Sequence, residues 1–220
     1  DVAASGRTIL LVSHNMGAIN QMCHRAIWID KGHLRMDNNA EKVVSSYLMS
    51  GSGEADGQTI WSDGIANAGV NEFKIKGIRI INDRGKITSK LDSMHPFWIE
   101  IQYSVEESLP ITQVGLRLHS SQGGMIFDAY DIDDHRYIGP RSPGNYISRC
   151  RIPGGLLNAG RYVVSIYASM TKIKILAYIQ DALLFDVEHS SDSGSHSYSG
   201  RKAHGVIHPK QLQWEQEKIS

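Results

Sequence analysis

Apolar and polar residues alternate with a period of two along most of the chain after residue 72. Every second residue is apolar from Phe97 to Val105 and from Val114 to Leu118. Similar runs, separated by turn residues, occupy 73–81, 125–129, 146–152, 162–168 and 182–187. This alternation indicates strands with one buried face. Seven short strands without a long amphipathic helix among them predict a mainly β fold, an antiparallel β-sandwich of immunoglobulin-like or jelly-roll-like type.

The first 50 residues follow a different pattern. The continuous apolar run Ile9–Val12 predicts a strand buried on both faces, as in a parallel sheet. Apolar residues then recur at helical spacing from Met16, and the strands 26–30 and 33–36 flank a Lys-Gly turn. A helix is expected over 40–49, capped by Asn38. Its apolar face is expected to consist of Val43, Val44, Tyr47 and Leu48.

Composition divides the chain into two units. The segment 51–57 is rich in glycine and contains no large apolar residue, which is typical of a flexible linker. We therefore expect an α/β unit over 1–50, a linker over 51–59 and a β-sandwich domain over 60–220. The polar segment 189–203 would be mobile and would precede a terminal strand.

The first unit resembles a known family. The stretch from Gly6 to Met16 (Gly-Arg-Thr-Ile-Leu-Leu-Val-Ser-His-Asn-Met) and the later Cys-His-Arg-Ala-Ile-Trp-Ile-Asp-Lys-Gly resemble the end of the ATPase domain of ABC transporters, most closely that of polysaccharide exporters. In that family a switch histidine follows the strand and contacts the γ-phosphate of ATP. The resemblance assigns this catalytic role to His14, in the complete ATPase only.

Most motifs of that ATPase are missing from the 220 residues. There is no Gly-x-x-x-x-Gly-Lys-Ser/Thr loop to bind phosphates, no Leu-Ser-Gly-Gly-type signature, and no apolar strand ending in Asp-Glu. Because phosphoryl transfer depends on positioning and charge neutralisation, we expect no ATP hydrolysis and no cofactor for this fragment. The resemblance implies ATP and Mg in a full-length protein that begins before it.

The resemblance extends into the predicted sandwich. The segments 155–167 and 205–210 resemble the C-terminal domain of Wzt-type O-antigen exporters, in which a β-sandwich binds the glycan to be exported. It implies an undecaprenyl-linked polysaccharide as ligand and a transmembrane exporter subunit as partner. It also implies a cytoplasmic location at the inner face of the bacterial plasma membrane, and a homodimer. Segment 190–200 could allow strand exchange between protomers, or could be a loop before a strand of its own sheet. The alternative function is a dimerisation or regulatory domain that binds no sugar.

Carbohydrate binding requires an aromatic ring over apolar C–H faces and planar polar groups for the hydroxyls. The period-two count places suitable side chains on the faces that point away from the core: Trp98, Gln102, Arg117, His119, Asp128, Tyr130 and Tyr167. Four have alternative roles. Trp98 could cover a sheet edge or a dimer interface, and Arg117 and Asp128 could form a cross-strand ion pair. Tyr167 could equally be an ordinary surface residue of a strand.

Other chemistry is less well supported. The acidic run from Asp128 to Asp134 lacks the EF-hand spacing of a calcium site, and a glycosidase would need two carboxylates at a defined separation. We expect solvated loop charges there and no metal site.

Cys23 and Cys150 form no Cys-x-x-Cys motif and are expected to be reduced thiols. Equal numbers of basic and acidic residues, 23 each, give no electrostatic case for nucleic acid. No apolar run approaches the length of a membrane span.

Overall fold

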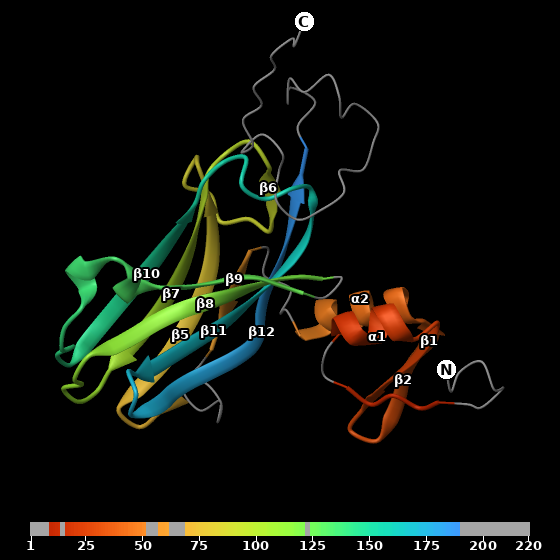
Figure 1. Ribbon diagram of the computed structural model, residues 1–220, viewed down its shortest axis with the longest axis horizontal. Coiled ribbons are helices and arrows are strands. Elements are labelled where there is room, and N and C mark those ends of the chain that lie inside the picture. Colours follow the sequence, from red (N-terminus) through yellow and green to blue (C-terminus); the bar gives the residue numbers. More distant parts are fainter. Residues whose placement is uncertain (1–8, 14–15, 52–56, 62–68, 122–123, 190–220) are drawn as a thin grey trace, which may run out of the picture.

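The computed structural model describes residues 9–13, 16–51, 57–61, 69–121 and 124–189. Most of them form two stacked β-sheets, with a small α/β unit beside them (Figure 1). Sheet I has the strand order β10-β7-β5-β3, and β4 also pairs with β5. Its strands are β3 (Gln58–Ile60), β4 (Gly69–Val70), β5 (Phe73–Asn82), β7 (Phe97–Val105) and β10 (Gly144–Ile152).

Sheet II has the strand order β6-β12-β11-β8-β9. Its strands are β6 (Lys90–Asp92), β8 (Thr112–Ser120), β9 (Met125–Tyr130), β11 (Gly160–Met170) and β12 (Lys174–Glu188). The short 3-10 helices η2 (Asp131–Asp133) and η3 (His135–Tyr137) follow β9. All strand pairs are antiparallel except β12 with β6, which confirms the predicted antiparallel sandwich.

The core lies between the two sheets and follows the alternation of the sequence. Phe73 and Ile99 of sheet I and Leu118 and Ile166 of sheet II are fully buried. In β5 the pairing register with β7 shifts between Ile75 and Gly77, so one extra residue is inserted. This bulge explains how β5 can change the parity of its buried positions and still keep one face in the core.

The α/β unit consists of α1 (Met16–Met22), the hairpin β1 (Arg25–Asp30) and β2 (His33–Asn39), and α2 (Ala40–Gly51). The hairpin and both helices are as predicted. The cap is not, because the side chain of Asn39, rather than Asn38, accepts the backbone N–H of Lys42 at 2.9 Å. Val43 and Val44 are buried, as expected for the apolar face, whereas Tyr47 is 42% exposed. The side chain of Leu48 lies outside the described part.

The strand predicted at Ile9–Val12 is wrong for this structure. These residues are irregular, and Ile9, Leu10 and Val12 are 61%, 86% and 89% exposed. A strand buried on both faces needs neighbouring strands and covering helices, and the described residues provide no partner for this run.

Several boundaries differ in detail from those expected. β3 begins at Gln58, within the segment expected to be a linker, and β6 had no sequence signal. β12 begins at Lys174, eight residues before the predicted run at 182–187, because irregular pairing hides its alternation. His14 and the expected terminal strand lie outside the described residues. Of segment 189–203, only His189 is described. The described part holds no helix with the length and apolarity needed to cross a membrane.

The acidic run after β9 is not simply solvated. Asp131 forms a largely buried ion pair with Arg141, 2.6 Å between Oδ2 and Nη2. Asp128 pairs with Arg117, and Asp134 pairs with Arg136 at the surface. Asp133 accepts the backbone N–H of Tyr130 at 2.8 Å, so each carboxylate of the run has a structural partner. The described residues contain no group of His, Cys, Asp and Glu side chains that could hold a metal ion.

Candidate functional site

Three tyrosines form a row across the outer face of sheet II. Tyr130 on β9 is paired in register with Gly115 on β8, Gly115 with Tyr167 on β11, and Tyr167 with Tyr178 on β12. The ring centroids of Tyr130 and Tyr167 are 6.2 Å apart, and those of Tyr167 and Tyr178 are 6.3 Å apart, both in edge-to-face geometry. We call these three residues the tyrosine row. It presents adjacent aromatic surfaces with hydroxyl groups at their ends.

Gly115 creates the space in this row. A Cβ atom at this position would lie 2.4 Å from the backbone oxygen of Ala129 and 2.5 Å from Cδ1 of Tyr130. The ring of Tyr130 therefore occupies the place that a side chain at position 115 would fill. This close approach fixes Tyr130 at the outer edge of the sheet and leaves backbone between it and Tyr167.

A charged pair lies in the next register row. Arg117 donates from Nε to Oδ1 of Asp128 at 2.6 Å and from Nη2 to Oδ2 at 2.8 Å. The hydrogen bonds from Arg117 lower the pKa of Asp128, and those to Asp128 raise the pKa of Arg117. Both groups are therefore ionised at neutral pH and held in one plane, with polar edges that can meet sugar hydroxyls.

The strand β12 contributes a bulge to the same face. Asp181 has a positive φ of 50°, and its backbone N–H donates to Oγ of Ser165 at 3.0 Å. The pairing of β11 and β12 is irregular here, passing from Val164 with Leu183 to Ile166 with Ile179. The bulge brings Gln180 and Asp181 to the rim of the site.

One end of the tyrosine row, Tyr178, together with Arg117 and the bulge, borders a cavity of about 390 Å³ between sheet II and the α/β unit. Sheet II supplies Arg117, His119 and Tyr178, and the first turn of α1 supplies Met16 and Gly17. Figure 1 shows α1 and α2 beside β12. On the side of the α/β unit, the cavity is bordered by a small apolar cluster. This cluster consists of Met16, Ile19, Val44, Val163 and Leu184.

Burial lowers the pKa of His119, with smaller opposing contributions from Asp181 and Asp128 and a lowering contribution from Arg117. As the pH falls through the unfolded-state pKa of histidine, the unfolded chain takes up a proton that the folded chain resists, so stability falls. We expect His119→Gln to lose less unfolding free energy than the parent between about pH 7 and pH 5. Urea denaturation at several pH values measures this; parallel curves for the two proteins would contradict it.

The structure gathers five of the seven predicted carbohydrate-binding residues on one face. These are Arg117, His119, Asp128, Tyr130 and Tyr167. Trp98 and Gln102 lie on the outer face of sheet I, on the opposite side of the sandwich. The predicted cross-strand pair of Arg117 and Asp128 is present, and it is part of this face.

Sequence reasoning missed Tyr178, Gly115 and Asp181. Tyr178 is paired with Tyr167, but the register shifts between Ala168 and Ser169, so a regular count outward from the β11–β12 turn would place Ala177 there instead. This shift near the turn hides Tyr178, and the bulge at Asp181 breaks the alternation of β12 a second time. Nothing in the sequence indicates that Asp181 adopts a left-handed conformation.

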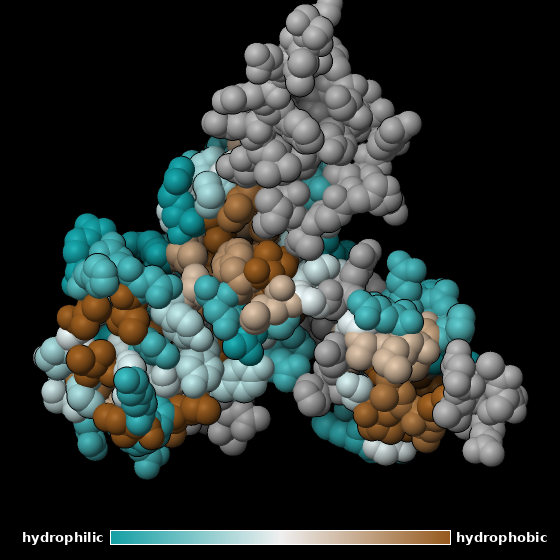
Figure 2. Space-filling view, in the orientation of Figure 1, coloured by the Kyte–Doolittle hydropathy of each residue, from teal (hydrophilic) through white to brown (hydrophobic). Residues whose placement is uncertain are grey.

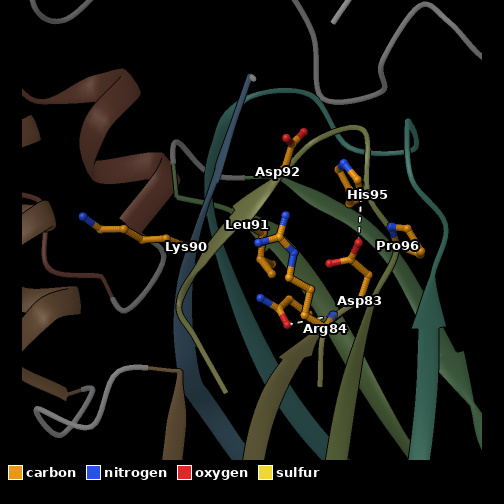
Figure 3. A pocket seen from close by; sticks show the side chains of 8 residues that line it. Asp83, Arg84, Lys90, Leu91, Asp92, His95 and Pro96 are labelled. Carbon is orange, nitrogen blue, oxygen red and sulfur yellow. Dashed lines mark hydrogen bonds and ion pairs between the residues drawn. The ribbon is translucent and has the colours of Figure 1, made fainter. Parts of the chain in front are cut away.

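A second hollow of about 200 Å³ lies at one end of the sandwich. Figure 3 shows Asp83 and His95 pointing toward one another there, with 2.8 Å between Oδ2 and Nδ1. Arg84, Lys90 and Asp92 also line it, and its lining contains no Phe, Tyr or Trp. It lacks the aromatic surface that stacking on a sugar ring requires, so the tyrosine row is the stronger candidate.

Comparisons with known proteins agree with this architecture. A family model described as the Wzt C-terminal domain matches residues 66–208. A crystal structure of the C-terminal domain of Wzt has a TM-score of 0.54 and 14% identity, covering 76% of this chain and 92% of that one. At this identity the structural match establishes the shared fold.

Relatives with longer chains are named as ATP-binding proteins of export systems. An O-antigen export system ATP-binding protein RfbB from Myxococcus xanthus is 23% identical over 178 residues, 74% of this chain and 38% of that protein. A teichoic acids export ATP-binding protein TagH from Listeria monocytogenes serotype 4b (strain F2365) is 39% identical over 44 residues, 20% of this chain and 13% of that protein. The chain thus spans well under half the length of these relatives. Since the family model covers more than half of its residues, the chain belongs to the Wzt C-terminal domain family.

Proposed function

We propose that the outer face of sheet II binds a polysaccharide, and that the chain is the C-terminal part of the ATP-binding subunit of an ABC exporter. The observation that carries the first part is the tyrosine row beside the Arg117–Asp128 pair. Aromatic rings can stack on the C–H faces of sugars, and the ionised pair and the backbone of the bulge can meet their hydroxyls. Recognition of this kind needs no bond to be broken, so the function is binding.

The α/β unit supports the second part of the proposal. Ile27, Ile29 and Leu34 on its hairpin are 52%, 65% and 64% exposed. Figure 2 shows apolar residues gathered on this unit. An exposed apolar patch of this kind is typical of a surface that another domain covers. We propose that the remainder of an ATPase domain covers it, in line with the names of the relatives.

The complete exporter would add the remaining components. A transmembrane subunit at the inner face of the bacterial plasma membrane, a lipid-linked polysaccharide and a second copy of the subunit belong to this proposal. ATP and Mg would bind in the complete ATPase domain, where His14 would contact the γ-phosphate. The 220-residue chain would supply the glycan-binding face.

Replacing Tyr167 at the centre of the row tests the binding function. Calorimetric titration with polysaccharide from the producing strain, released from its lipid, should show saturable binding. Tyr167→Ala should weaken it about tenfold, because one stacked ring contributes on the order of 1 kcal/mol. Tyr137→Ala is the matched control, since Tyr137 is an exposed tyrosine on η3 and is not part of the row.

Two results would contradict the proposal. Equal affinities of the parent and Tyr167→Ala would remove the row from the site. No binding by a folded, dimeric parent would favour the dimerisation domain instead, and light scattering would report the dimer.

A further inference from the structure

The outer face of sheet I carries a concentration of positive charge. The strands β5, β7 and β10 contain the basic residues Lys74, Lys76, Arg79, Arg149 and Arg151, against one carboxylate, Glu100. The strands of sheet II are balanced by comparison, and the whole chain has a formal net charge of zero. This asymmetry makes one face of a neutral protein attractive to anions.

Glu100 organises the centre of this face. It lies in register between Arg79 on β5 and Arg149 on β10, and its side chain is only 4% exposed. Nε of Arg79 donates to one carboxylate oxygen at 2.5 Å, and Nε of Arg149 donates to the other. Burial alone would raise the pKa of Glu100, but the two arginines lower it below its usual value. Glu100 is therefore an ionised anchor for two guanidinium groups.

The two arginines use only Nε in these hydrogen bonds with Glu100. Among the described residues nothing binds their terminal nitrogens, and the side chains of Arg79 and Arg149 are 31% and 57% exposed. Guanidinium groups bind carboxylates and phosphates through two parallel N–H groups, and a fixed orientation reduces the entropy lost on binding. The buried carboxylate thus holds two anion-binding groups in place.

An aromatic surface lies directly beside this pair. Trp98 occupies the next outward position on β7, and the guanidinium of Arg151 lies 5.9 Å from its ring centroid. Gln102 lies on the same face, on the other side of Glu100. An aromatic ring, an amide and fixed guanidinium groups together suit a sugar ring that carries a negative charge.

We propose that this face, centred on Arg79, Glu100 and Arg149, binds a carboxylate- or phosphate-bearing unit of a polysaccharide. This inference rests on the proposed function, but it concerns the opposite face of the sandwich. Two copies of the chain do not fit together through this face on both sides, because that pairing would oppose positive charges. The anion supplies the complementary charge that this face lacks.

Titration of the 220-residue protein at low salt with a short oligogalacturonate and with inorganic phosphate tests the proposal. Binding of the first indicates a carboxylate, and binding of the second alone indicates a phosphate. A neutral maltooligosaccharide of equal length should bind more weakly. Arg149→Gln should weaken binding of the anionic probe about tenfold, because it removes a charge-assisted hydrogen-bond donor. Arg136→Gln, at an exposed arginine on η3, is the matched control.

A neutral triple variant separates a loss of binding from a loss of folding. Changing Arg79, Glu100 and Arg149 together to glutamine leaves no buried charge unpaired, and thermal melting reports whether the sandwich is intact. The folded triple variant should lose binding of the anionic probe, while Tyr167→Ala should retain it. Unchanged affinity in the triple variant would overturn the proposal and leave the tyrosine row untouched. Binding of anionic vesicles or single-stranded DNA without either small probe would also overturn it.

Discussion

Replacing Asp131 by alanine is expected to lower the free energy of unfolding by about 3–5 kcal/mol, because it leaves the guanidinium of Arg141 buried without its counter-ion. Arg141 is 8% exposed, and its Nη2 also donates to the backbone oxygen of Thr112 at 3.1 Å. Asp131 itself accepts hydrogen bonds from the backbone N–H of Val114 at 3.0 Å and from Oγ of Ser148 at 2.8 Å. The pair therefore connects η2 and the loop before β10 to both sheets.

Urea denaturation measures the effect, and the neighbouring Asp134→Ala provides the control. Asp134 forms an ion pair at the surface with Arg136, and such pairs contribute between zero and about 1 kcal/mol. Burial raises the pKa of Asp131, which indicates that removing the pair from water is costly. Replacing both partners by apolar residues should therefore cost less than Asp131→Ala alone. Equal effects of Asp131→Ala and Asp134→Ala would show that the pair is not buried as described.

The sequence predicts the sandwich well because its signal is local. Side chains alternate across a strand, so every second residue from Phe97 to Val105 and from Tyr162 to Ala168 identifies the core face without knowledge of strand pairing. The same count places Arg117 and Tyr167 on an outer face. It does not say which outer face, so it groups Trp98 with them although Trp98 lies on the other sheet.

What the sequence does not predict depends on tertiary contacts between separate elements. Asp131 is one of several aspartates in a loop, and only the approach of Arg141 from a later segment makes it a buried ion-pair partner. The run Ile9–Val12 has the composition of a central strand, but a strand also needs neighbours. The bulge at Asp181 alters the register of β12, and local alternation cannot locate it.

The candidate site also depends on a residue without a side chain. Gly115 should not tolerate alanine, because the new Cβ would lie 2.4 Å from the backbone oxygen of Ala129 and 2.5 Å from the ring of Tyr130. β9 is an edge strand and can move only by weakening its pairing with β8. We expect Gly115→Ala to lower the free energy of unfolding by about 1–3 kcal/mol, as for other overpacked positions.

The same substitution should weaken polysaccharide binding more than tenfold, since it displaces Tyr130 and the Arg117–Asp128 pair that joins the same two strands. Urea denaturation and calorimetric titration measure the two effects. Gly139→Ala is the matched control, because a Cβ there meets no atom within 4 Å. If Gly115→Ala retained both parent stability and parent affinity, the position of Tyr130 over the glycine would play no part in the site. Loss of affinity with stability retained would instead place the role of Gly115 in shaping the binding face alone.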